Sequence, residues 1–450
     1  MQMMKITRFY DSISPENTCV VSLADNQLTI KDTKKGKTTT TTKPFHNEED
    51  ALDAYYEAMS AIVSEGYNPE DIPFEGSSAM YEPQTGKMYI VSVEGLTMTT
   101  EIINKGKSKT TQKEFESNQK ATKGYYTKVW ANMKKGYIVY NEDAQPGQAM
   151  LHRFVTNYYN GGLGFAYTPQ GFFVYGTNGQ AKDSDDFLLL LNARGKMLRK
   201  IDVPQSIVAT MYYHAPGNML YLCSWHNIYK YDLNKDELIL LLENKGNPLS
   251  FLSGSDKCIA YGSHPQWVVE DQEGNVLYKQ DFDVEILKGA FPFCTVLSKD
   301  GKMLAMSCRE GTIELLEASS GKLLRTIEGD FPTVMQMEFT EGDSTLVMQE
   351  THGSWRIRYF NVATGKEVKI KGLMLPEFVK DTSAFCFNED ESLMVQQSYW
   401  RIYVFDYRRK RYLYTITMEH AARWGDVKFV DNNTIGVRTD CGCFSLYKVR

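Results

Sequence analysis

The chain has 450 residues, of which 42% are hydrophobic and 24% are charged. This is the composition of a globular protein of about three domains, and it excludes a disordered chain, a collagen-like repeat and a coiled coil. With 50 basic and 56 acidic side chains, the formal net charge is −6, which is too small to suggest a chain-wide attraction to nucleic acid or to a membrane surface. Aromatic residues make up 12% of the chain and favour β-strands.

Hydropathy and cysteine placement indicate a compartment. The chain opens without an apolar run of about seven residues, and no segment approaches about 20 apolar residues, so we expect neither a signal peptide nor a membrane partner. The eight cysteines are widely scattered, which suits reduced, buried thiols better than a disulfide framework. The sequence therefore predicts a cytoplasmic protein.

The N-terminal third contains two copies of one unit. Because a missed repeat changes the whole fold prediction, we look for self-similarity first. An offset of 70 positions brings five landmarks into register: Val21-Ser22 with Val91-Ser92, Lys35-Gly36-Lys37 with Lys105-Gly106-Lys107, Phe45 with Phe115, Tyr55-Tyr56 with Tyr125-Tyr126, and Gly66-Tyr67 with Gly136-Tyr137.

In each copy, the spacing of the apolar residues changes along the chain from one typical of strands to one typical of a helix. In the first copy, short β-type runs precede a helix that Asn47 can cap and that Gly66 ends. The second copy repeats this order with Ser117 and Gly136. Each copy is therefore predicted to be a small antiparallel sheet that carries one helix. The two expected modules are residues 1–73 and 74–143.

This order of strands, a Gly-containing turn, a phenylalanine, a helix and a closing Gly-Tyr resembles the WGR domain. The resemblance covers residues 18–67 and, more weakly, 87–137. Thr29-Ile30-Lys31 and Thr99-Thr100-Glu101 stand at the Trp-Gly-Arg position. Because the WGR domain contacts DNA in poly(ADP-ribose) polymerases and in some bacterial regulators, the resemblance implies a possible nucleic-acid contact.

From about residue 148 the pattern changes to strand-like runs that arrive four to a unit. The unit recurs at roughly 40 to 45 residues, which is the spacing of a β-propeller blade. Six units follow one another, at residues 164–203, 208–242, 249–281, 291–328, 334–370 and 383–418.

A seventh unit, residues 426–449, stops one strand short. Residues 149–156 can supply the missing strand, and their pairing with the last blade would close the ring without an open sheet edge. The predicted fold class is mainly β: two small α+β WGR-like modules and a seven-bladed β-propeller at 148–450. The propeller resembles the WD40 type in architecture, although the Gly-His and Trp-Asp signature pairs are absent.

Catalytic and cofactor motifs are lacking. The sequence contains no phosphate-binding G-x-x-x-x-G-K-[ST], no H-E-x-x-H, no C-x-x-C and no G-x-S-x-G. Cys441-Gly442-Cys443 puts two thiols on one face of a strand, but no partner pair lies nearby in sequence, and His420 suggests no chemistry. We therefore expect a non-enzymatic protein without cofactor or metal. A propeller hydrolase or lyase with channel carboxylates is the alternative.

The turns between the second and third strands of the blades carry large polar and aromatic side chains. Trp225, Trp267, Arg309, Trp355 and Trp400 follow one another at 42, 42, 46 and 45 residues, so we expect them at one structural position on one face. Such side chains anchor protein partners; the alternative is that each tryptophan packs against a neighbouring blade. The predicted partner-binding residues are Trp225, His226, His264, Trp267, Arg309, His352, Trp355, Trp400 and Arg401.

Lysines and threonines alternate along a hairpin in each module. Ammonium groups in this pattern could contact the phosphates of a nucleic acid, while solvated surface lysines are the alternative. The first helix is acidic and the second basic, which suggests that the two copies dock on each other. The candidate nucleic-acid contacts are Lys34, Lys35, Lys37, Lys105, Lys107 and Lys109.

Overall fold

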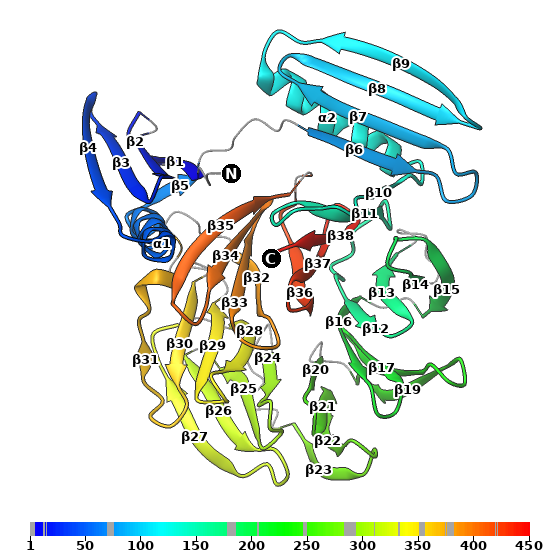
Figure 1. Cartoon of the computed structure of the whole chain (residues 1–450). Helices are drawn as coiled ribbons and strands as arrows, with labels where there is room; N and C mark the ends of the chain where they lie inside the picture. Colours follow the sequence, from blue (N-terminus) through cyan, green and yellow to red (C-terminus); the bar gives the residue numbers. More distant parts are fainter. Residues whose placement is uncertain are drawn as a thin grey trace.

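A computed structural model shows a mainly β protein, which confirms the predicted fold class: its described residues form 38 strands and only two α-helices. Figure 1 shows a ring of small sheets with two further modules at its edge. The structure describes residues 5–450 except 12–13, 15, 70–75, 178–185, 205–206, 246–249, 283–293, 310, 332–333, 351–355, 374, 376–381, 419 and 421.

The first module is a five-stranded antiparallel sheet in the order β4-β3-β2-β1-β5, with one helix against it. Asn47 caps the helix, since its side chain accepts a hydrogen bond from the backbone N of Asp50 at 2.8 Å. The elements are β1 (Lys5–Asp11), β2 (Thr18–Ala24), β3 (Gln27–Lys34), β4 (Lys37–Pro44), α1 (Glu48–Ser64) and β5 (Tyr67–Pro69).

The second module repeats this topology in the order β9-β8-β7-β6-β10. Ser117 caps its helix in the place of Asn47. The offset of 70 holds for the three strands before each helix and for the start of the helix. The elements are β6 (Gly76–Tyr81), β7 (Met88–Glu94), β8 (Thr97–Asn104), β9 (Lys107–Glu114), α2 (Asn118–Met133) and β10 (Ile138–Tyr140).

Six four-stranded antiparallel sheets follow as blades 1 to 6. In most blades the inner strands are largely buried, whereas outer strands such as β23 and β27 are mostly exposed. Blades 1 to 3 are β12 (Phe165–Thr168), β13 (Gly171–Gly176), β14 (Asp186–Leu191) and β15 (Met197–Val203); β16 (Val208–His214), β17 (Met219–Ser224), β18 (Asn227–Asp232) and β19 (Glu237–Glu243); β20 (Ser250–Gly254), β21 (Cys258–Ser263), β22 (Gln266–Asp271) and β23 (Val276–Asp281). Blades 4 to 6 are β24 (Cys294–Leu297), β25 (Met303–Arg309), β26 (Thr312–Glu317) and β27 (Leu323–Glu328); β28 (Val334–Thr340), β29 (Thr345–Glu350), β30 (Ile357–Asn361) and β31 (Glu367–Val368); β32 (Thr382–Phe387), β33 (Leu393–Ser398), β34 (Arg401–Asp406) and β35 (Arg411–Thr417), with a 3-10 turn at Lys371–Leu373 before β32.

The seventh blade is built from both ends of the propeller segment. Its strands are β36 (Gly425–Asp431), β37 (Thr434–Thr439), β38 (Cys443–Lys448) and β11 (Ala149–Phe154). Strand β11 runs antiparallel to β38, with His152 opposite Ser445. Lys428 Nζ donates to the carbonyl oxygen of Phe165 at 3.1 Å, which links blade 7 to blade 1.

The second module and blade 7 form one continuous sheet. Strand β10 pairs with β6 on one side and with β11 on the other, so the nine strands run in the order β36-β37-β38-β11-β10-β6-β7-β8-β9 (Figure 1). Backbone hydrogen bonds therefore cross the expected boundary between residues 143 and 148, and they set how the second module sits on the ring.

The first module is attached through side chains. Helix α1 packs on blade 6, next to its outer strand β35 (Figure 1). Arg411 Nη1 donates to Asp53 Oδ1 at 2.7 Å, and Ser60 Oγ accepts from the backbone N of Tyr412 at 2.6 Å. Helix α2 packs in a cluster with Phe154 and Cys443 of blade 7. The two helices thus each pack on the propeller, which corrects the expectation that their opposite charges dock the modules on each other.

Candidate functional site

The turns between second and third strands lie on the same face as the segments that connect one blade to the next. The backbone N of Trp225 donates to the Ile207 carbonyl oxygen at 3.2 Å, and the N of Lys245 donates to the His264 carbonyl oxygen at 3.0 Å. In blade 6 the N of Met418 donates to the Trp400 carbonyl oxygen at 2.7 Å. We call this side of the ring the turn face, defined by the turns 225–226, 264–265 and 399–400.

Trp225 and His226 form the turn of blade 2 and are both exposed on the turn face. Trp225 retains 38% of its surface exposed. A Cβ built on Gly161 would lie 3.4 Å from the indole ring, so one side of the ring rests on the glycine-rich entry to blade 1. The exposed aromatic surface and the polar imidazole beside it form one small exposed platform on the turn face.

Trp400 belongs to the turn of blade 6 and is 41% exposed. Its neighbour Arg401 has another role, because Arg401 Nη2 lies 3.4 Å from the Tyr10 hydroxyl oxygen of the first module. Blades 2 and 6 are three blades apart by the shorter way round the ring, so Trp225 and Trp400 lie on one face without forming one pocket.

Trp267 corrects the sequence prediction. It is the second residue of β22, is only 4% exposed, and packs between Phe251 and Tyr278. The turn of blade 3 consists of His264 and Pro265 instead, with His264 half-buried. Trp267 therefore occupies the position of Ile228 in blade 2, two residues after the turn, and it stabilises the blade without being available to a partner.

Three further predicted residues, Arg309, His352 and Trp355, are described only in part or not at all. Arg309 is the last residue of β25 and pairs through its backbone with Thr312, while its side chain lies outside the described part of the structure. His352 and Trp355 also lie outside the described residues. The predicted ring of tryptophans thus reduces to two exposed members in the part of the chain that the structure describes.

The lysines of the two hairpins are all exposed. Lys34 forms an ion pair with Asp32 at 3.0 Å, and Lys35 and Lys105 occupy the tight turns with positive φ. Lys37, Lys107 and Lys109 lie on the edge strands β4 and β9. The two sets belong to separate sheets, so each hairpin is a surface of its own.

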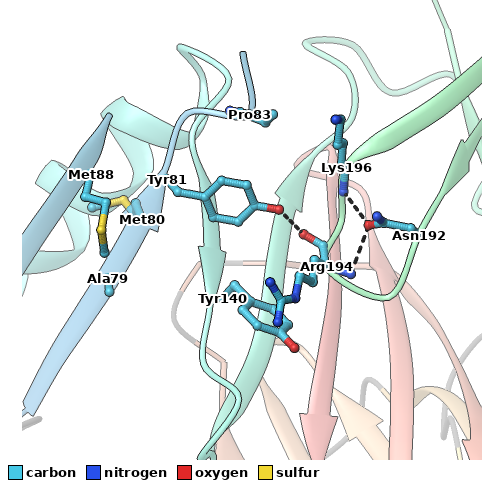
Figure 2. Close-up of a pocket in the computed structure, with 9 residues that line it drawn as sticks. All are labelled: Ala79, Met80, Tyr81, Pro83, Met88, Tyr140, Asn192, Arg194 and Lys196. Carbon is cyan, nitrogen blue, oxygen red and sulfur yellow. Dashed lines mark hydrogen bonds between the residues drawn. The ribbon is translucent and has the colours of Figure 1, made fainter. Parts of the chain in front are cut away.

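A cavity of about 460 Å³ lies where the second module meets blade 1 (Figure 2). The Tyr81 hydroxyl donates to the Arg194 carbonyl oxygen at 2.5 Å, and the Arg194 guanidinium lies 5.3 Å from the Tyr140 ring centre. This site was not predicted, because its walls come from two parts of the chain with no shared motif. The lining residues are Ala79, Met80, Tyr81, Pro83, Met88, Tyr140, Asn192, Arg194 and Lys196.

The cysteines that the structure describes carry free thiols, and most of them are buried. Burial raises the pKa of the Cys223 and Cys294 thiols to about 12, so these thiols stay protonated and unreactive at neutral pH. Among the described residues, one cluster has a composition that suits a metal ion: His152, His420 and Cys443 place their donor atoms within 4.8 Å of one another.

Comparisons with known proteins support the fold. No family model and no curated protein matches the chain, so the resemblance of the modules to the WGR domain stays a prediction. A solved structure titled "Crystal Structure of Mitotic Checkpoint Complex" matches with a TM-score of 0.52 and 12% identity, over 69% of this chain and 99% of the matched chain. This similarity supports the propeller fold. Neither described helix is long and apolar enough to span a membrane.

Proposed function

We propose that this protein is a non-enzymatic scaffold that binds a protein or peptide partner on the turn face of its propeller. The observation that carries this proposal is the exposure of Trp225 and Trp400, at 38% and 41%, in turns that share one face. Soluble proteins usually bury much of such large apolar side chains, and exposed aromatic groups that stand on a rigid scaffold are typical anchors for a partner.

The chemistry of the platform favours a polypeptide. Trp225 offers the flat face and the N–H of an indole, and the adjacent His226 adds a polar group that can donate or accept. A partner side chain that covers an indole removes apolar surface at about 25 cal/mol per Å², so burying about 60 Å² contributes about 1.5 kcal/mol.

The structural neighbour is consistent with this role, because its title names a complex. At 12% identity the neighbour supports the propeller as an interaction platform and says nothing about which partner this chain binds. Reduced, buried thiols fit a cytoplasmic setting for such a scaffold. The exposed hairpin lysines have the surroundings of solvated surface groups, and we do not assign them a nucleic-acid ligand.

Quantitative affinity purification tests the proposal. We expect Trp225→Ala and Trp400→Ala to lower the enrichment of at least one reproducible partner by about tenfold or more. Binding of that partner should then be remeasured with both proteins purified. The matched control is Tyr167→Ala, which removes an aromatic side chain that is 51% exposed next to a turn on the opposite face.

The outcomes separate cleanly. A partner lost with both tryptophan variants and kept with Tyr167→Ala, at unchanged Tm, supports the turn face. An interaction profile that is the same for the wild type and both tryptophan variants contradicts it. Loss of the partner together with a large fall in Tm would instead show that the tryptophans act by packing.

A further inference from the structure

We propose that His152, His420 and Cys443 bind a zinc ion at the seam where the propeller ring closes. The three donor atoms lie within 4.8 Å of one another. They come from β11, from the segment between β35 and β36, and from β38. The inference does not rest on the partner-binding proposal above, although the segment that carries His420 joins blade 6 to blade 7 on the same face of the ring.

Strand pairing brings two of the donors together. His152 faces Ser445 across the β11–β38 ladder, and Phe154 faces Cys443. Since alternate residues of a strand point to the same side, His152 and Cys443 lie on one face of the sheet, on diagonal positions of neighbouring strands. Both side chains are buried, with exposed fractions of 1% and 0%.

Trp130 of α2 holds the third donor over this face. Its ring stacks on His420 with a centroid separation of 5.6 Å and an interplanar angle of 22°. The His420 ring meets the His152 ring edge-on at 5.7 Å. Two imidazoles and one thiol thus lie around a common point, where α2, the β11–β38 strand pair and the segment between β35 and β36 meet.

Each imidazole has a hydroxyl beside one of its nitrogens. Ser445 Oγ lies 2.7 Å from His152 Nδ1, and Thr439 Oγ1 lies 3.2 Å from His420 Nε2. A hydroxyl that accepts from one ring nitrogen fixes the proton there, so the other nitrogen of that ring carries the lone pair that a metal needs. Metal-binding histidines are commonly oriented in this way.

The donor set selects the ion. Two imidazole nitrogens and one thiolate suit Zn²⁺, whereas Mg²⁺ and Ca²⁺ prefer oxygen ligands. Zinc bonds of about 2.0–2.1 Å to nitrogen and about 2.3 Å to sulfur place two nitrogens and one sulfur of a tetrahedral site roughly 3.3–3.6 Å apart. The side chains therefore need to draw in by about 1 Å, and three protein donors leave one position of the tetrahedron for a fourth ligand such as a water molecule.

A zinc ion here would have a structural role. It would join the first and last strands of the ring to the segment that enters blade 7, under the helix of the second module. Ions bound by the folded state alone stabilise it by mass action. We therefore expect bound zinc to raise the Tm of the full chain by several degrees.

The test uses the full chain, purified with an affinity tag that contains no histidine. Elemental analysis should find about one zinc per chain, and His420→Gln should lower this content by about tenfold or more. His214→Gln is the matched control, because it removes a buried imidazole of blade 2. A chelator should lower the Tm of the wild type but not that of His420→Gln, and added zinc should restore it.

Cobalt substitution tests the sulfur ligand separately. Co²⁺ bound by the wild type should give a thiolate-to-cobalt charge-transfer band, which Cys443→Ser should abolish and Cys223→Ser should retain. A wild type that stays without zinc after incubation and dialysis, with unchanged Tm and no cobalt band, overturns the proposal. So does zinc that persists in both His420→Gln and Cys443→Ser, and so does copper in place of zinc.

Discussion

Replacing Trp267 and Trp225 separately by alanine should separate packing from partner binding. Trp267 is 4% exposed and lies in a core cluster with Phe251 and Tyr278 at centroid separations of 6.5 and 5.1 Å. Truncating a buried tryptophan to alanine costs about 3–5 kcal/mol, because transfer energy is lost and a cavity remains. Trp225 keeps 38% of its surface exposed, and its truncation should cost about 1 kcal/mol or less.

The assay is thermal unfolding followed by circular dichroism. A propeller of roughly 300 residues has an unfolding entropy of about 0.6 kcal/mol per kelvin, so Trp267→Ala should lower Tm by about 5–8 °C and Trp225→Ala by less than about 2 °C. Both variants lose one tryptophan, so they are matched in composition. Equal Tm shifts for the two variants, in either direction, would refute the distinction between a buried and an exposed position.

Three further perturbations probe the attachment of the first module, the ring seam and the channel side of the ring. Arg411→Met removes the ion pair with Asp53. The substitution should lower the free energy of unfolding by about 1–3 kcal/mol and make hydrogen–deuterium exchange in α1 faster. Gly195→Ala should lower Tm, because Gly195 has φ of +72° and a Cβ there would lie 2.6 Å from Leu151 Cδ1 of β11. Burial raises the pKa of the Glu338 carboxyl group to about 8. Because the folded state therefore holds the carboxyl proton more tightly than the unfolded state, the stabilisation from this group is complete below about pH 4.5 and is lost as the pH rises to about 8. Glu338→Gln should remove that part of the pH dependence of Tm.

Each of these variants has a control. Arg408→Met removes an exposed guanidinium of the same blade and should leave exchange in α1 unchanged. Gly274→Ala is the control for the backbone angle, because Gly274 has a similar positive φ of +83° and no neighbour within 4 Å of an added Cβ. A larger loss of Tm in Gly274→Ala than in Gly195→Ala would contradict the clash with Leu151. Glu328→Gln removes an exposed carboxylate; a Tm profile that changes with pH equally in both glutamine variants would contradict the assignment to Glu338.

Repeat spacing predicted most of the architecture. The 70-residue offset and the 40–45-residue unit both depend on turn residues and apolar runs, which recur because each copy must make the same turns and bury the same faces. The first and last strands of each module were missed. Lys5–Asp11 and Gly76–Tyr81 share no sequence landmark, and β5 and β10 are only three residues long.

The candidate site was harder to predict, because turn register decides exposure. Trp225 and Trp267 are 42 residues apart, but their turns are only 39 residues apart, at 225–226 and 264–265. A shift of three residues carries Trp267 out of the turn and onto a buried strand position. The cluster of His152, His420 and Cys443 depends on contacts between segments almost 300 residues apart, for which a single sequence gives no spacing signal.

The two copies of one module are held to the same ring by different kinds of bonds. The second copy continues a backbone ladder, so an attached label or fused domain would move with the ring as one rigid body. The first copy is held by the apolar packing of α1 on the ring and by polar side-chain contacts, without a shared backbone ladder, so its removal would not open a sheet edge of the ring. A chain shortened to begin at residue 76 should keep β11 paired on both sides, with β10 and with β38. A chain that begins at residue 143 would lack β10, so the outer edge of β11 would be unpaired and prone to pair with other chains.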